Sequence, residues 1–213
     1  LYVAHNTSSR IVEQLSWSLP QKKRVWQKVV QEKINHQADL LSLVDLNDES
    51  EVIRQYSLDV RSGDSSNREA VAAKCYFSVL FGSEFCRDDD TSLNAALNYG
   101  YSILMSTVAR EIVSRGYLTQ TGICHRSEFN QFNFACDLME PFRPVVDKTI
   151  LSRFEGDFSK ELRHHLSDLV NEELPYKDGR YRLSSVISGF VQDCLNALNK
   201  KTSVSEISSF ELS

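Results

Sequence analysis

The sequence predicts an all-α protein, and two observations carry this prediction. The 213 residues include only eight glycines and four prolines, so long stretches of the chain contain no turn signal. Within those stretches apolar residues recur at the three- and four-residue spacing of a helix that buries one face. There is no heptad array, internal repeat or low-complexity block, so we expect a multi-helix globular domain and not a coiled coil or a solenoid.

The helices are expected in a definite order along the chain. Pro20 favours a helix start, and an apolar stripe then continues through 20–46. A shorter acidic segment follows over 47–61, and Gly63 ends it. Asp64 to Asn67 offer capping side chains for the next helix. Further helices are predicted over 67–81, 94–115, 132–151, 159–173 and 183–199.

Two places in this helical pattern require a departure from it. Pro141 and Pro144 lie inside the 132–151 segment and must kink or break that helix. The stretch 176–182, YKDGRYR, has turn chemistry and suits a small hairpin. We divide the chain into a linker over 1–9, one helical domain over 10–200 and a flexible, serine-rich tail over 201–213.

Bulk properties limit the classes of function. The net charge of −5 argues against a protein that coats DNA by charge alone, although placed lysines and arginines can still hold individual phosphates. Five cysteines without a Cys-x-x-Cys pattern indicate reduced thiols and a cytoplasmic protein. No apolar run is long enough to predict a membrane span.

The stretch HRSEFNQFNFACDLMEPFRPVVD, residues 125–147, is the strongest candidate for chemistry. Asp137 and Glu140 are three residues apart, so a helix places both carboxylates on one face. Two such acids repel each other unless a cation lies between them, and a metal ion is the simplest cation. In the structural alternative, Asp137 pairs with Arg143 or another base and Glu140 faces water.

Two further side chains complete a possible metal site. His125 lies in a loop before this helix, and Glu69 lies in the first turn of the predicted 67–81 helix. Each also has a plain structural explanation, because a lone histidine is often structural and an acid is favoured at a helix N-terminus. Carboxylates with one imidazole suit Mg²⁺ or Mn²⁺ better than zinc. Nucleophile signatures and glycine-rich phosphate loops are absent from the sequence.

Three blocks of the sequence together resemble the CRISPR-associated adaptation integrase, specifically its type II branch. They are NREAVAAKCYFSVLFG, LNAALNYGYSILMSTVAREIVSRGYLTQTGICH and FACDLMEPFRPVVD. The resemblance covers most of residues 10–200 and implies the helical catalytic domain of that family. The family's N-terminal β-sandwich domain is largely missing from this chain, and residues 1–9 match the linker that follows it.

The resemblance also assigns the site residues. It implies a metal site of Glu69 in EAVAAKCYF, His125 in LTQTGICH and Glu140 in DLME, with Asp137 as an alternative or additional ligand. Softer matches suggest substrate contacts for four more side chains, with core packing as the alternative for the first three: Asn94, Tyr99, Tyr101 and Arg143. Local basic residues are expected to contact DNA phosphates: Arg10, Lys22, Lys23, Arg24, Arg68, Lys74, Arg126, Lys200 and Lys201.

The implied activity is insertion of new spacer DNA into a CRISPR array, an antiviral function. The 3′-OH of a DNA fragment, the prespacer, would attack a phosphodiester at the repeat, assisted by Mg²⁺ or Mn²⁺. The implied partners are double-stranded DNA, a second copy of the chain in a homodimer, a small companion adaptation subunit that bridges two dimers, and type II helper proteins. No membrane partner is implied.

Two other functions compete with this one. An all-α metal phosphohydrolase would carry a His-Asp doublet, which this sequence lacks. A metal-free helical scaffold of the adaptation complex would leave Glu69, His125 and Glu140 apart. The positions of these three side chains are therefore the observation to seek in a structure.

Overall fold

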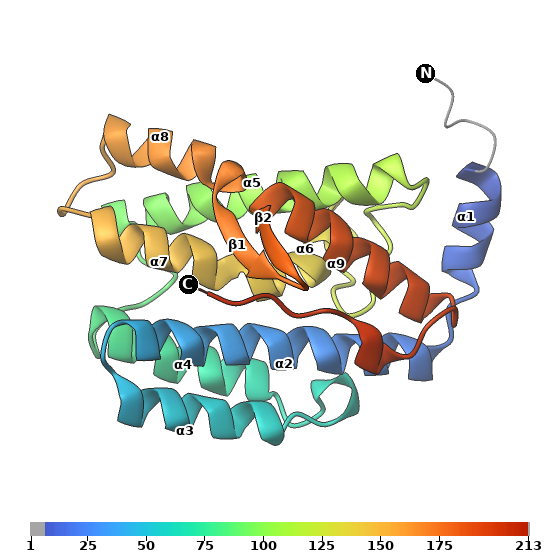
Figure 1. The fold of residues 1–213 in the computed structure, drawn as a ribbon, viewed down its shortest axis with the longest axis horizontal. Helices are drawn as coiled ribbons and strands as arrows, with labels where there is room; N and C mark the ends of the chain where they lie inside the picture. The colour runs from blue at the N-terminus through green and yellow to red at the C-terminus, as the bar shows by residue number, and fades with distance from the viewer. Residues whose placement is uncertain (1–6, 213) are drawn as a thin grey trace.

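Helix α2 forms the long central element of the fold, and the computed structural model describes residues 7–212 around it. One layer consists of α2 with the shorter helices α3 and α4, which lie along it (Figure 1). The η1 turn connects α3 to α4. The bounds in this layer are Leu19–Leu43 for α2, Asn47–Leu58 for α3, Ser62–Asp64 for η1 and Arg68–Phe81 for α4.

A second layer packs on the opposite side of α2, and α1 stands at one end of the molecule (Figure 1). In this layer α5 contacts α6, α7, α8 and α9. A two-stranded antiparallel hairpin, β1–β2, precedes α9. The bounds are Thr7–Leu15 for α1, Ser92–Ser114 for α5, Asn133–Met139 for α6, Arg143–Arg153 for α7, Lys160–Asp168 for α8, Glu173–Tyr176 for β1, Gly179–Arg182 for β2 and Leu183–Leu198 for α9.

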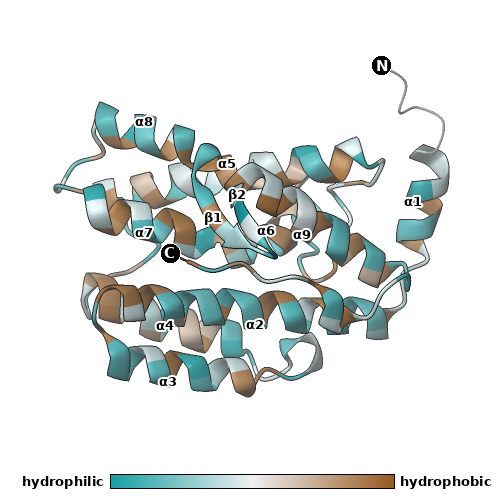
Figure 2. Ribbon diagram, in the orientation of Figure 1, coloured by the Kyte–Doolittle hydropathy of each residue, from teal (hydrophilic) through white to brown (hydrophobic). Residues whose placement is uncertain are grey.

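The apolar stripe of α2 explains its central position. Pro20 lies in the first turn, where its missing N–H and fixed φ are tolerated. Val25 and Val29 are one helical turn apart, as are Val30 and Ile34, and all four are fully buried between the layers. Each buried aliphatic side chain of this kind stabilises the fold by about 1.5–3 kcal/mol. Figure 2 shows the same division on most helices, which carry both polar and apolar residues.

The proline-containing segment breaks where the sequence requires it. Helix α6 ends at Met139, and the short 3-10 turn η2 follows over Glu140–Phe142 before α7 begins at Arg143. Pro141 lacks an N–H and therefore cannot continue the hydrogen-bond ladder of α6. The break directs Glu140 into the interior, where it is only 2% exposed.

The C-terminal segment differs from the flexible tail expected over 201–213. Its described part contains the η4 turn (Val204–Glu206) with a capping box at Ser203, and Ile207, Phe210 and Leu212 are buried. Phe210 stacks on Phe142 of η2 with ring centroids 5.1 Å apart. The serine-rich composition pointed to disorder, but three apolar side chains at suitable spacing hold the segment against the core.

His36 of α2 joins this C-terminal segment to η2. Its Nδ1 lies 2.8 Å from the carbonyl oxygen of Pro141 and its Nε2 lies 3.0 Å from that of Phe210. The carboxylate of Glu32 also lies near this ring, 3.9 Å from Nε2.

The all-α prediction is confirmed, and so are the hairpin and the main helices, with boundaries shifted by a few residues. Residues 1–6 of the predicted linker lie outside the described residues, while its last three, 7–9, belong to α1. Within residues 7–212, no helix is long and apolar enough to cross a membrane. The five cysteines are all free thiols.

Candidate metal and nucleic-acid site

The α4 N-terminus positions Glu69. The carboxylate of Asp64 accepts the backbone N–H groups of Arg68 and Glu69, at 2.8 and 3.0 Å, and so satisfies two of the unpaired donors that begin the helix. Glu69 therefore projects from a fixed first turn, with 28% of its side chain exposed. Asp64 was one of four predicted capping residues, and it is the one whose side chain makes these bonds.

Glu69 and Glu140 meet at the ammonium group of Lys33. The Nζ atom of Lys33 lies 2.5 Å from Oε1 of Glu69 and 2.5 Å from Oε2 of Glu140. The other oxygen of Glu140 accepts from Arg143, at 2.9 Å from Nε and 2.8 Å from Nη2. The two carboxylates thus share one cation, the ammonium group of a lysine, whereas the sequence pattern predicted a shared cation between Asp137 and Glu140.

The charges explain how Glu140 stays ionised inside the protein. Burial alone would raise its pKa, but the positive charges of Arg143 and Lys33 outweigh burial and lower the pKa to about 2. Burial likewise opposes the charge on Lys33, and the two glutamates reverse the effect and raise the Lys33 pKa. Glu140, Lys33 and Arg143 are therefore all charged at neutral pH.

Asp137 and His125 form a second pair beside the first. Oδ2 of Asp137 accepts the backbone N–H groups of Ile123 and Cys124, and Oδ1 accepts that of His125. Nδ1 of His125 lies 2.7 Å from the same Oδ1. This hydrogen bond raises the pKa of His125, and the nearby charges of Glu140 and Glu69 add to the rise. Asp137 is thereby occupied as the residue that orients the imidazole.

Gly122 allows this loop to pass close to the carboxylate of Asp137. A Cβ atom at position 122 would lie 2.5 Å from the carbonyl oxygen of His125 and 2.6 Å from Oδ2 of Asp137. Neither atom can retreat without breaking the hydrogen bonds around Asp137. The glycine is therefore required by the site and not by a turn.

These positions bring two of the three predicted metal ligands to one point. Glu69 and Glu140 converge on Lys33, while His125 lies nearby with Nδ1 already bonded and 44% of its side chain exposed. Among residues 7–212, no three histidine, cysteine, aspartate or glutamate side chains are grouped closely enough to hold a metal ion. The structural alternative for this stretch holds for Asp137, which pairs with a base, His125. It is wrong for Glu140, which is buried and pairs with Arg143 and does not face water.

Most of the softer candidates have structural partners. Asn94 is buried, and its amide donates to the carbonyl oxygens of Cys86 and Asp89, which organises the acidic loop. Tyr101 is buried, with its hydroxyl 2.5 Å from Asp147 and its ring under Arg143. Tyr99 packs against Phe158. These three fit the packing alternative, whereas Arg143 takes part in the site itself.

Sequence reasoning missed Lys33 and Asp147. Asp147 is buried between the hydroxyls of Tyr76 and Tyr101, at 2.8 and 2.5 Å. Burial raises its pKa to about 6 despite these two donors. The signal that points to Lys33 is its place on the buried side of α2, one residue before Ile34, because a lysine there needs a buried anion.

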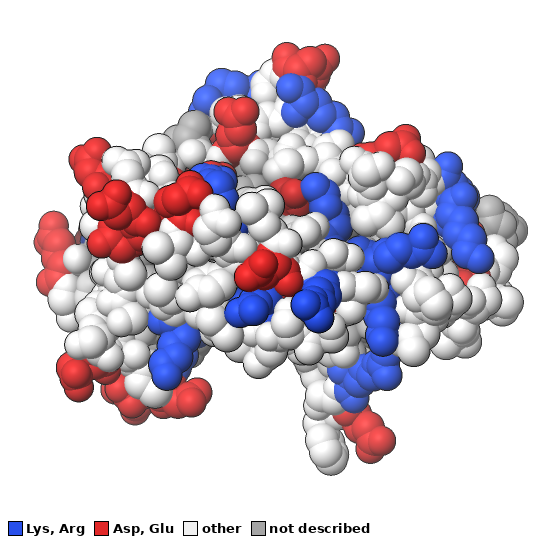
Figure 3. Space-filling view, turned by 90° about the horizontal axis from the view of Figure 1, so that it is seen from below, with Lys and Arg blue, Asp and Glu red and all other residues white. Residues whose placement is uncertain are grey.

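A cavity of about 510 Å³ opens beside His125. Lys22 and Arg126 contribute positive charge to its wall and Glu128 a negative charge. Four amide side chains also line it: Gln120, Asn130, Gln131 and Asn133. Figure 3 shows that lysine and arginine side chains gather over one half of the face that α3 and α4 present, and acidic side chains over the other. The chain thus has a local basic region although its net charge is negative.

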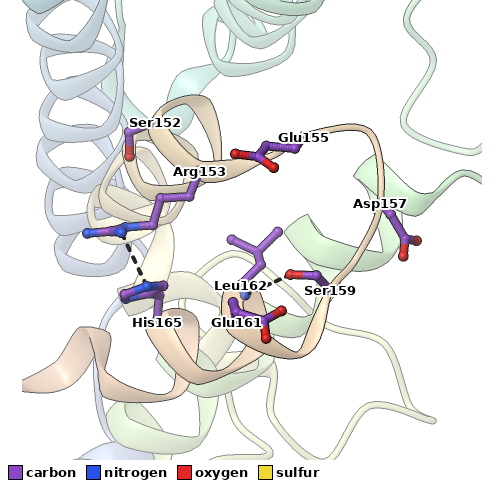
Figure 4. Close-up of a pocket in the computed structure, with 8 residues that line it drawn as sticks. All are labelled: Ser152, Arg153, Glu155, Asp157, Ser159, Glu161, Leu162 and His165. Carbon is purple, nitrogen blue, oxygen red and sulfur yellow. Dashed lines mark hydrogen bonds between the residues drawn. The ribbon is translucent and has the colours of Figure 1, made fainter.

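A second cavity, of about 530 Å³, has a different character (Figure 4). It lies between the C-terminal end of α7 and α8, where Arg153 contacts His165 at 3.2 Å and Glu155, Asp157 and Glu161 face solvent. Helix α7 begins at Arg143, beside Glu140, and ends at this cavity. The carboxylate site and this second cavity therefore lie at opposite ends of one helix. The second cavity contributes nothing to the site described above.

Comparison with known proteins decides the family. The family described as CRISPR associated protein Cas1 matches residues 3–159, which is most of the chain. This protein belongs to the Cas1 family. A CRISPR-associated endonuclease Cas1 from Neisseria meningitidis serogroup C (strain 8013) is 39% identical over 178 residues, which is 83% of this chain and 59% of the relative. The chain therefore spans less than two thirds of the length of that relative.

Solved structures support the fold of this Cas1 chain. A casposase bound to integration product superposes with a TM-score of 0.75 at 20% identity, covering 97% of this chain and 74% of the other. A Cas1 protein from Thermotoga maritima gives 0.73 at 18% identity, covering 88% and 69%. A partial Cas6-RT-Cas1–Cas2 complex gives 0.76 at 20% identity, covering 97% and 74%. These TM-scores establish a shared fold.

Proposed function

We propose that this Cas1 chain is the catalytic part of a metal-dependent DNA integrase that inserts spacer DNA into a CRISPR array. The observation that carries the proposal is the carboxylate pair of Glu69 and Glu140, which converge on one cation beside an imidazole fixed by Asp137. Two carboxylates and one imidazole form a donor set that fits Mg²⁺ or Mn²⁺. Lys33 marks the position that a cation takes between the two acids.

The residues that would hold the ion are Glu69, Glu140 and His125. Asp137 keeps Nδ1 of His125 engaged, which leaves Nε2 as the nitrogen available for coordination. When bound, a divalent ion neutralises charge that develops on the transferring phosphate and favours ionisation of the attacking hydroxyl. Asp137, already bonded to four donors, is proposed as a positioning residue and not as a ligand.

The proposed reaction is a transesterification. The 3′-OH oxygen of the incoming strand forms a new P–O bond, the bridging P–O bond of the target strand breaks, and the leaving 3′-oxygen takes up a proton. No covalent enzyme intermediate is needed. Lys22 and Arg126, on the wall of the cavity beside His125, are placed to hold phosphates of one DNA strand near the carboxylates.

The proposed partners are double-stranded DNA, a second copy of the chain and a small companion subunit. Two related structures motivate this proposal: the casposase bound to integration product and the complex that contains Cas1 and Cas2. The Neisseria relative, at 39% identity, favours a type II system with its helper proteins. The cytoplasm is the proposed location.

A strand-transfer reaction tests the proposal. Full-length protein and its companion subunit are mixed with a DNA fragment bearing free 3′-OH ends, a supercoiled repeat-containing plasmid and Mn²⁺. We expect joined product with the wild type, and loss of product with EDTA, with His125→Ala and with Glu140→Gln. A wild type that binds DNA and its companion but joins nothing would favour the scaffold function. Hydrolysis of phosphomonoesters without joining would favour the phosphohydrolase.

A further inference from the structure

Lys33 is the buried cation of the candidate site, and the proposed function gives it no part. It is 6% exposed, projects from α2, and binds a carboxylate from each of two other elements, α4 and η2. Burying an ammonium group is costly unless it is paired. Lys33 forms ion pairs with both Glu69 and Glu140, and these two pairs fix its position between the acids.

The gap that Lys33 fills is the one a metal ion would need. Its Nζ contacts Oε1 of Glu69 and Oε2 of Glu140 at 2.5 Å each. Carboxylate oxygens bind Mg²⁺ at about 2.0–2.1 Å. An ion held by these same two oxygens would therefore lie almost where the nitrogen lies. An ammonium group and a divalent ion cannot both occupy that position.

We propose that Lys33 is a built-in competitor of the metal ion, which holds Glu69 and Glu140 together in the metal-free protein and is displaced when a divalent cation binds. This inference rests on the proposed metal dependence of the site. Without a cation between them the two acids would repel each other. With Lys33 the site is assembled in advance but closed until a divalent ion replaces the ammonium.

Arg143 makes the exchange possible without loss of order. It binds Oε1 of Glu140, and Lys33 binds Oε2 of the same carboxylate. Departure of Lys33 thus frees one oxygen of Glu140 for an ion, while Arg143 still holds the other. The charge of Lys33 in its present position already acts on the buried carboxylate of Asp147 and lowers its pKa, so a second anion lies near the ammonium.

The test compares Mn²⁺ binding by the wild type and by Lys33→Met, using isothermal titration calorimetry and Mn²⁺ electron spin resonance. Removing the competitor should tighten Mn²⁺ binding at least about tenfold, which corresponds to about 1.4 kcal/mol. The matched control is Lys28→Met, because Lys28 pairs with Glu32 at 2.6 Å on the same helix. This control should bind Mn²⁺ like the wild type. Equal affinity for Lys33→Met and the wild type would overturn the inference.

A second measurement uses the wild type, so it does not depend on how well Lys33→Met folds. Lysines are acetylated with and without Mn²⁺, and the labelling of Lys33 and Lys28 is read by mass spectrometry. Displacement should raise the labelling rate of Lys33 severalfold on Mn²⁺ addition and leave that of Lys28 unchanged. No change at Lys33 while Mn²⁺ binds would refute displacement. Absence of any Mn²⁺ binding by the wild type would instead refute the proposed metal site.

Discussion

The carboxylate of Asp137 bonds to both the backbone N–H and the imidazole ring of His125. One carboxylate oxygen accepts the His125 N–H at 2.9 Å and lies 2.7 Å from Nδ1 of the ring. The other oxygen accepts two more backbone N–H groups of the same loop. Asp137 therefore fixes the loop that carries His125 and also sets the orientation of its imidazole.

Replacing Asp137 tests whether this residue positions His125 or binds the metal ion itself. In Asp137→Asn the negative charge is lost and one acceptor oxygen becomes an NH2 group that faces N–H donors, so we expect strand transfer to fall about 10–100-fold. The pKa of His125, measured by NMR titration, should fall toward its ordinary value, since Asp137 is the main cause of its rise. Asp193→Asn is the control, because Asp193 also accepts a backbone N–H, at Ser208, but lies outside the site. An unchanged His125 pKa would contradict the positioning role.

Asp147 predicts a pH dependence of stability. Its folded-state pKa of about 6 exceeds the ordinary 3.8 because the side chain is buried, so the folded chain favours the protonated acid. The resulting stabilisation is complete below 3.8 and is lost as pH rises through about 6. Between pH 7.5 and 5 the wild type should gain about 1.4 kcal/mol of unfolding free energy that Asp147→Asn does not.

Denaturant unfolding of both proteins at the two pH values measures this difference. His125 also has a raised pKa and adds stability as pH falls, but it does so in both proteins and cancels in the comparison. Parallel pH profiles for the wild type and Asp147→Asn would show that the acid is ionised throughout this range.

The basic cavity beside His125 predicts the salt dependence of DNA binding. Removing one side chain that neutralises a phosphate should reduce the slope of log affinity against log salt by about 0.9 for duplex DNA. The double variant Lys22→Gln with Arg126→Gln should therefore reduce that slope by nearly two. Lys160→Gln with Arg163→Gln removes the same charge from exposed positions on α8 and should leave the slope unchanged. Equal slopes for both double variants would place the DNA elsewhere.

The C-terminal segment should support the site through η2. Phe210 packs on Phe142 and on His36, with the His36 ring centroid 4.0 Å away. Phe210→Ala should lower the unfolding free energy by about 3–5 kcal/mol and, by loosening η2, also reduce strand transfer. Leu58→Ala, at a position 73% exposed, is the control and should change neither. A Phe210→Ala protein with normal stability would mean that the segment is not held against the core.

Residue patterns predicted the helices because apolar spacing and proline positions act locally. The same local signals placed Glu69 at a helix start and Pro141 at a helix break. They did not reveal Lys33, because a lysine within a helical pattern is expected on the solvent side until the acids from α4 and η2 are seen to meet it. Nor did they reveal the packed tail, whose apolar residues are few and whose partners lie on distant elements.

The central claim is that Glu69, Glu140 and His125 hold one divalent cation. The most direct measurement is an anomalous difference map from crystals of the protein soaked in Mn²⁺. The account predicts a single strong peak between the two carboxylates and Nε2 of His125, with the ammonium of Lys33 moved out of the gap. A map without a peak at this position, in which Lys33 still bridges Glu69 and Glu140, would contradict it.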